Sequence, residues 1–404
     1  MTPVRSAEPQ RRYRLYVLGN SLNNLGNAFY LVVLPLVVYR LTGSSLSMAL
    51  TVAAEALSTL LLPLWGVWVD RTSPLATIAA ALMFQACISA VLPLGLAGGW
   101  LTAPDVYVIS FLVGVGANAL GTAQARVVPM MFPASKARAS AGLTTAYTAT
   151  TVVGPLLAAA ALAHHQELSL MWANSVSFLA PLALWPWTRI PAARPVAAGR
   201  ERLPASLSAG LALLRQQRAT AIPLVGALVA LGLSYSVAAV FAAYRLLHDF
   251  HWPDAAVGLM FVALGLGGLV GTRLPLWQRR YPLHTWLAMD LALNAMGLAA
   301  MMAPWPGMIP VGLGLTGVGY LSLAVARNLW LQEAVPTTHL ARANATIRTA
   351  TGGAGLVGTV LLGVLSRGVG VEWSFGVLLL LGALPALWPL GRLLRSGASS
   401  RPAS

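Results

Sequence analysis

The chain has 404 residues, of which 57% are hydrophobic and only 9% are charged. Soluble globular proteins carry about 25% charged residues, so this composition excludes a water-soluble enzyme. The single cysteine excludes a disulfide scaffold, and the high apolar content excludes a disordered chain. The net charge of +15 does not indicate nucleic-acid binding, because the basic residues lie in short clusters between apolar runs rather than along one face.

Apolar runs of about 20 residues, the length that crosses a hydrocarbon core of ~30 Å, follow one another from end to end of the chain. The twelve runs cover residues 15–39, 46–69, 75–98, 104–125, 139–162, 169–188, 219–244, 255–277, 283–303, 307–331, 343–366 and 371–391. Every backbone amide in hydrocarbon must be satisfied inside its own segment, so the runs predict helices. We therefore expect an all-α polytopic membrane protein with twelve transmembrane helices.

Positive charge falls almost entirely on one side of these predicted helices. If the N-terminus is inside, only Arg40, Arg245 and Arg367 of the 26 basic residues lie on the outer side. Short cytoplasmic loops collect arginine and lysine, so this asymmetry predicts that both termini are cytoplasmic in a plasma (inner) membrane.

The longest cytoplasmic segment, residues 189–218, divides the predicted helices into two sets of six. We expect an N-terminal bundle over 1–188 and a C-terminal bundle with a short cytoplasmic tail over 219–404. The halves share a loop pattern, since Arg138-Ala139-Ser140-Ala141 in one corresponds to Arg342-Ala343-Asn344-Ala345 in the other. Two related six-helix halves indicate a transporter with its site near the bilayer midplane.

The turn between runs 46–69 and 75–98 reads Gly66-Val67-Trp68-Val69-Asp70-Arg71. It resembles the Gly-x-x-x-Asp-Arg loop of the major facilitator superfamily, and the helix number, central loop and half-repeats extend the resemblance over the whole chain. The resemblance implies that Gly66, Asp70 and Arg71 control gating, in a fold of two pseudo-symmetric bundles that works by alternating access. Pro74-Leu75-Ala76 stands where the family has further basic residues. The alternative is a tight turn with a surface ion pair.

Two further segments resemble one branch of that superfamily. The stretch from Asn20 to Asn27 and the closing Thr42-Gly43-Ser44 are similar to macrolide-efflux and enterobactin-exporter proteins. Gly154-Pro155 is similar to the start of the antiporter signature of drug exporters, although alanines replace the later paired glycines. These resemblances imply efflux coupled to proton antiport.

Asparagines recur at helical spacing in run 15–39, at positions Asn20, Asn23, Asn24 and Asn27. Polar side chains in a bilayer seldom face lipid, so these contact either another helix or a water-filled cavity. In the family that the chain resembles, helices 1, 4, 7 and 10 line the cavity. The resemblance therefore adds four cavity candidates: Asn118, Thr122, Tyr235 and Tyr320.

Glu55 lies about nine residues into run 46–69, which places it roughly 14 Å along the helix and near the midplane. A charged carboxylate there costs several kcal/mol, so it must be protonated, paired or in contact with water. A carboxyl group that meets the two sides alternately can carry a proton, and we predict that Glu55 couples transport to protons. The alternatives are an ion pair with Arg348 or a neutral structural carboxyl.

For the other charged residues within the apolar runs, the sequence favours structural ion pairs over a role in transport. We expect Asp290 to pair with Arg273, Arg279 or Arg280. Arg126 and Arg327 are expected to neutralise Asp70 or Glu333, and the alternative is contact with an anionic substrate.

No catalytic or metal-binding constellation is present in the sequence. The glycine clusters 265–268 and 352–355 lack the following Lys-Ser/Thr of a phosphate loop and predict close helix contacts instead. We therefore expect a monomeric secondary transporter, with no enzymatic activity and no cofactor, that exports an amphipathic small molecule such as a drug, a macrolide-like compound or a siderophore. The alternatives are an uptake symporter for a polar metabolite and a membrane sensor or scaffold.

Overall fold

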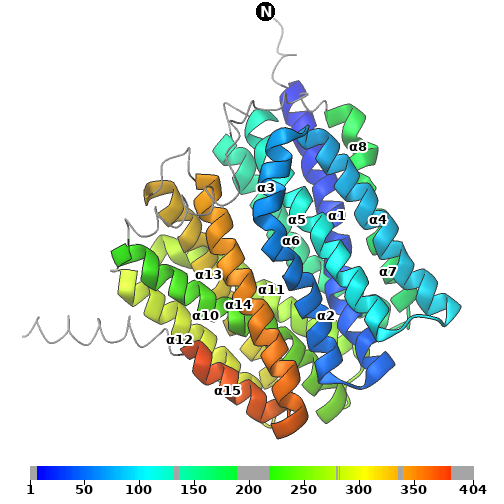
Figure 1. Cartoon of the computed structure of the whole chain (residues 1–404), viewed down its shortest axis with the longest axis vertical. Coiled ribbons are helices and arrows are strands. Elements are labelled where there is room, and N and C mark those ends of the chain that lie inside the picture. The colour runs from blue at the N-terminus through cyan, green and yellow to red at the C-terminus, as the bar shows by residue number, and fades with distance from the viewer. Residues whose placement is uncertain are drawn as a thin grey trace, which may run out of the picture. The chain divides into compact units, whose positions relative to one another are not determined.

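The computed structural model describes residues 7–131, 136–188, 218–278, 281, 283–334 and 340–383. Within these ranges the chain forms helices and no strands (Figure 1). All but two of the predicted runs each match one helix: α1 (Ala7–Thr42), α4 (Pro74–Gly98), α5 (Ala103–Met131), α6 (Lys136–Leu162), α10 (Arg218–Tyr244), α11 (Asp254–Gln278), α12 (Leu283–Met301), α13 (Met308–Ala334), α14 (Leu340–Val369) and α15 (Val371–Ala383).

The helices have the length and composition of membrane spans. Among the described residues, 9 helical stretches are long and apolar enough to cross a membrane, and Ser45–Leu61 and Thr285–Met301 are shorter apolar helices. This confirms the expected all-α membrane fold and is consistent with twelve spans.

The sequence predicted a continuous helix over 46–69, and the structure breaks it. The run forms α2 (Ser45–Leu57), the 3₁₀ turn η2 (Ser58–Leu61) and α3 (Leu62–Arg71). The Ser58 hydroxyl donates to the carbonyl oxygen of Glu55 at 2.6 Å, and the Thr59 hydroxyl donates to that of Ala56 at 2.7 Å. Pro63, in the first turn of α3, has no backbone N–H to continue the helix. Side-chain competition for carbonyls and a proline together end α2.

Run 169–188 is broken in the same way. It forms α7 (Glu167–Ser177) and α8 (Ala180–Thr188), and the amide of Leu179 bonds to the carbonyl of Val176 between them. Pro181 stands in the first turn of α8, where a missing N–H does no harm.

By their contacts, the described residues fall into two compact units. The first unit contains the described residues of Met1–Thr42, Leu61–Glu201 and Pro253–Val262. The second unit contains the described residues of Gly43–Leu60, Arg202–Trp252 and Ala263–Ser404. Each unit therefore contains most of one predicted half and a short piece of the other: α2 belongs to the second unit, and the start of α11 to the first. The predicted central loop 189–218, except Arg218, lies outside the described residues, and the predicted division of the chain there stays a prediction.

In the second unit, glycines let helices approach until backbones touch. A Cβ atom at Gly267 of α11 would overlap the carbonyl oxygen of Gly314 on α13, and one at Gly271 would overlap that of Val318. In the other predicted cluster, a Cβ at Gly352 would come within 2.5 Å of the Thr59 hydroxyl. The predicted close helix contacts of both clusters are confirmed.

Gly267→Ala is expected to destabilise the protein strongly. The atom that its methyl group meets belongs to a backbone, so α11 and α13 must separate, and overpacking of this kind costs about 1–3 kcal/mol or more. Thermal unfolding of purified protein, followed by size exclusion, measures the loss. Gly226→Ala on α10 is the matched control, because a Cβ there meets no atom within 4 Å. Equal unfolding temperatures for the two variants would contradict the packing argument.

Candidate functional site

In the first unit, Asn20 is held between two helices. Its side-chain amide donates to the carbonyl oxygen of Tyr16 at 2.8 Å, and its Oδ1 accepts from Nε2 of Gln124 on α5 at 2.7 Å. Asn20 and Gln124 also line a cavity of about 20 Å³, which has room for about one water molecule. These contacts favour interhelical hydrogen bonding as the role of Asn20.

The other polar candidates of this unit differ in exposure. Asn23 is only 3% exposed, and its Oδ1 has no hydrogen-bond partner among the described residues. Asn24 is half-buried, and Asn27 is exposed. On α5 the hydroxyl of Thr122 donates to the carbonyl oxygen of Asn118 at 2.8 Å. Asn27 is thus the asparagine of α1 whose side chain is most accessible.

In the second unit, the two tyrosine candidates lie in contact. The rings of Tyr235 on α10 and Tyr320 on α13 stack with centroids 4.0 Å apart and an interplanar angle of 15°. Both side chains are half-buried. The resemblance named them separately as residues of helices 7 and 10, and the structure joins them into one aromatic surface.

One arginine lies on the same face of α13 as Tyr320. Arg327 follows Tyr320 by seven residues, so both lie on one face of α13. Its guanidinium donates to Oδ1 of Asn328, from Nε at 3.2 Å and from Nη2 at 3.1 Å. Arg348 on α14 is exposed.

Glu55 is exposed in the last turn of α2, directly before the 3₁₀ turn. Within the described part of the chain, no hydrogen bond or ion pair involves its carboxylate. In particular, no ion pair joins it to Arg348, although α2 packs against α14. Glu55 therefore has an exposed side chain, and its predicted membrane depth stays a prediction.

Asp290 connects α12 to α13. It is fully buried and accepts a hydrogen bond from the hydroxyl of Ser322 at 3.1 Å. Of its three predicted partners, Arg273 is exposed and forms no ion pair with it, while Arg279 and Arg280 lie outside the described residues. One turn later, Asn294 donates to the hydroxyl of Ser234 at 2.9 Å. Sequence reasoning missed this bond, although Asp290 and Asn294 stand at helical spacing.

Two charge clusters at helix ends were also missed. In the first unit, Arg40 at the end of α1 pairs with Glu167 at the start of α7 and with Asp254 at the start of α11. In the second unit, Arg245 in the π-helical end of α10 (η3, Arg245–Asp249) is only 5% exposed.

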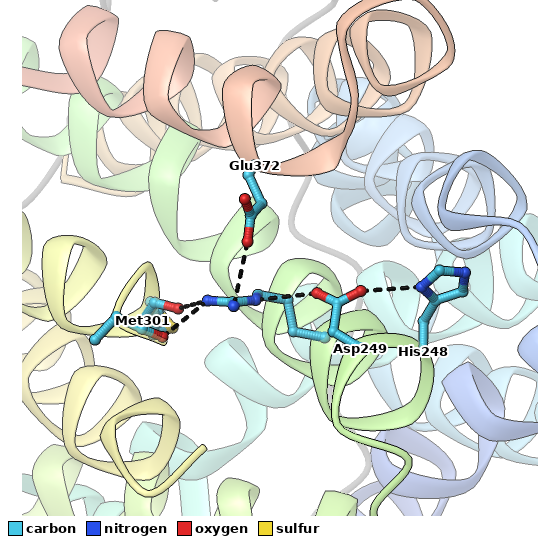
Figure 2. A network of polar contacts seen from close by, with 6 residues as sticks. His248, Asp249, Met301 and Glu372 are labelled. Carbon is cyan, nitrogen blue, oxygen red and sulfur yellow. Dashed lines mark hydrogen bonds and ion pairs between the residues drawn. The ribbon is translucent and has the colours of Figure 1, made fainter. Parts of the chain in front are cut away.

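Figure 2 shows the contacts of Arg245. Its guanidinium donates to the carbonyl oxygens of Met301 at 2.8 Å and Ala303 at 3.1 Å, and pairs with Asp249 at 3.1 Å and Glu372 at 3.2 Å. The sequence held a signal for these ion pairs. Acidic residues stand at the start of several apolar runs on the predicted outer side, where the few basic residues are their natural partners.

Comparison with known families decides which fold this is. Residues 16–302 match the family model described as Major Facilitator Superfamily. The chain belongs to the Major Facilitator Superfamily. No curated protein matches its sequence.

Solved structures show the same fold at low identity. A mutant of the nucleoside transporter NupG is similar with a TM-score of 0.73 and 14% identity, over 94% of this chain and 99% of that one. A bacterial homologue of the iron transporter ferroportin, in an inward-facing state, has a TM-score of 0.71 and 16% identity, over 96% and 99%. A bacterial homologue of the human lysosomal transporter Spinster has a TM-score of 0.71 and 14% identity, over 96% and 97%. This major facilitator protein is therefore a membrane transporter by its family.

For the predicted gating motif of this major facilitator protein, the structure describes only the backbone. Gly66, Asp70 and Arg71 lie in α3, and their side chains are outside the described part of the structure, as is that of Arg126. Their predicted roles stay predictions.

The antiporter-like pair lies inside α6, and both residues are buried. A Cβ atom at Gly154 would overlap that of Ala28 on α1, so this position requires glycine for α1 and α6 to pack. The packing gives Gly154 a structural reason that is independent of transport.

Proposed function

We propose that this major facilitator protein exports an amphipathic small molecule, such as a drug, a macrolide-like compound or a siderophore, in exchange for protons. It would do so as a monomer in the plasma membrane, with both termini in the cytoplasm. The observation that supports proton coupling best is that Glu55, which the sequence predicts to lie near the bilayer midplane, is exposed and has no ion-pair partner among the described residues. Such a group must be protonated or hydrated in a bilayer, so a proton is its natural counter-ion.

The break in run 46–69 supports a conformational role for this segment. The boundary between the two compact units falls between Leu60 and Leu61, within the 3₁₀ turn Ser58–Leu61. A short 3₁₀ stretch inside a longer helix often marks a hinge. We propose that movement at this turn changes the side from which Glu55 takes up its proton, with Gly66, Asp70 and Arg71 controlling the cytoplasmic side.

The direction of transport is supported by the sequence resemblances at Asn20–Asn27 and Gly154-Pro155. The similar structures share the fold, and their printed functions cover nucleosides, iron and lysosomal transport. An uptake symporter for a polar metabolite is therefore the alternative that an experiment must separate from export.

Accumulation of a panel of toxic amphipathic compounds in cells tests the direction. Cells that overproduce the protein are expected to accumulate less of a substrate than cells with an empty vector, and a protonophore is expected to remove the difference. Overproduction that raises accumulation in a protonophore-sensitive manner would instead establish uptake. A difference that survives the protonophore would contradict proton coupling.

A further inference from the structure

We propose that Arg40 and Asp254 form a latch that closes the predicted outer side of the transporter, and that this side opens when Asp254 separates from Arg40 while Glu167 stays bound to it. The inference rests on the alternating access of the proposed function. It depends neither on the direction of transport nor on proton coupling.

The latch joins three helix ends within the first unit. Arg40 lies in the last turn of α1, Glu167 is the first residue of α7, and Asp254 is the first residue of α11. Nη1 of Arg40 pairs with Oε1 of Glu167, and Nη2 pairs with Oδ2 of Asp254. The side chains of Glu167 and Asp254 are only 14% and 24% exposed, whereas that of Arg40 is 47% exposed. One half-exposed guanidinium therefore holds the starts of two helices.

Of these helices, α11 is the one that such a latch would release. Its residues 254–262 belong to the first unit, and its residues 263–278 belong to the second. The later part is fixed by backbone contact, since a Cβ atom at Gly267 would overlap the carbonyl oxygen of Gly314 on α13. The helices α1 and α7 lie wholly in the first unit. Of the two carboxylates that Arg40 holds, only that of Asp254 stands on a helix that continues into the second unit.

A second contact of α11 lies on the same face as Asp254. Gly258 follows Asp254 by four residues, so the two positions lie one above the other on the helix. A Cβ atom at Gly258 would come within 2.6 Å of the Cβ of Ala159 and within 2.9 Å of its backbone nitrogen, so α11 touches the backbone of α6 here. Ala159 is only 4% exposed. The face of α11 that carries the latch thus also covers the last turn of α6.

Separation of the latch leaves neither charge without compensation. Arg40 keeps Glu167 and its contact with water. Asp254 stays in the first turn of α11, where the unpaired amide groups of the helix favour a carboxylate. An ion pair with a half-exposed partner contributes little to stability by itself, so its separation costs little. An arginine that is shared in this way can release one partner and bind it again.

Hydrogen–deuterium exchange tests the latch in the full-length protein in phosphatidylcholine nanodiscs, without substrate or pH gradient. In Asp254→Asn, amide exchange in residues 254–262 and 155–162 is expected to rise about fivefold, because loss of a weak ion pair moves a two-state equilibrium by this order. Exchange at the opposite ends of the same helices, residues 270–278 and 136–144, is expected to fall, because alternating access closes one side as the other opens. Loosening of a merely structural contact would not protect the opposite ends.

Glu167→Gln is the matched control. It removes a first-turn carboxylate from the same arginine but leaves the pair with Asp254, so exchange at both ends should stay at the wild-type level. Asp254→Glu retains the carboxylate and should also resemble wild type. If Asp254→Asn does not fold, Arg40→Gln, which removes the same pair from the other side, decides instead.

Unchanged exchange in Asp254→Asn would overturn the proposal. Faster exchange at the latch end without protection of the opposite ends, or an equal effect of Glu167→Gln, would overturn it as well. Any of these results would leave the proposed export standing, because neither the direction of transport nor proton coupling enters the exchange measurement. Conversely, uptake instead of export in the accumulation assay would leave the latch standing.

Discussion

Glu55→Gln is expected to abolish proton-driven transport in proteoliposomes and to leave the protein folded. Glutamine has nearly the same size and keeps the hydrogen-bonding capacity of a protonated carboxyl, but it cannot release a proton. Glu55 forms no ion pair within the described part of the chain, so the substitution leaves no charged partner uncompensated there. Its carbonyl oxygen, which accepts from Ser58, belongs to the backbone and is retained.

The measurement is substrate flux under an imposed pH gradient, compared with substrate exchange without a gradient. Exchange should survive in Glu55→Gln, because substrate binding and the conformational change do not require the carboxyl group. Asp105→Asn is the control: Asp105 accepts from the amide and hydroxyl of Thr102 at the start of α5, where asparagine also serves as an acceptor. Gradient-driven flux at the wild-type rate in Glu55→Gln would end the assignment of this residue to coupling.

Arg245→Leu is expected to destabilise the second unit more than any other single arginine substitution in the described chain. The side chain is almost fully buried and pairs with Asp249. It also donates to the carbonyl oxygens of Met301, at the end of α12, and of Ala303, just beyond it. Leucine leaves the two carbonyl oxygens without their donor, and a buried acceptor that loses its partner costs about 1–3 kcal/mol. The pair with the exposed Glu372 contributes less, since water screens it.

Thermal unfolding of the purified variant measures this loss. Arg245→Lys is expected to lie between wild type and Arg245→Leu, because an ammonium group cannot reach both carbonyls and both carboxylates at once. It would also weaken the stacking of the guanidinium over the rings of Phe241 and Phe250, at 5.7 Å and 4.9 Å. Arg367→Gln, at an exposed position, is the control. An unfolding temperature equal to that of the control would show that the network contributes little.

Hydropathy alone predicted the helices well, because burial in lipid demands long apolar runs whatever their neighbours are. It could not predict the breaks, since Ser58, Thr59 and Pro63 are tolerated in many continuous membrane helices. Their effect depends on the hydrogen bonds that the hydroxyls select. The local signal was nevertheless present as two hydroxyl residues followed by a proline.

The site was less predictable than the fold. Tyr235 and Tyr320 entered through family resemblance, and their stacking depends on how closely α10 and α13 pack. The helical spacing of the asparagines did not reveal that Asn20 is already bonded to Gln124, because that partner lies on another helix. Arg245 was counted as an exception to the charge asymmetry, and its partners on α12 and α15 lie far along the chain.

The composition of the two units has a consequence for biosynthesis. The first unit includes the start of α11, whose Asp254 supplies a carboxylate to Arg40, and the second unit includes α2, which packs on α14. A nascent chain that has been synthesised only as far as α8 therefore lacks part of its first unit. The packing partner of α2 is synthesised about three hundred residues after α2 itself. The two units can therefore be completed only after α11 and α14, respectively, have been synthesised.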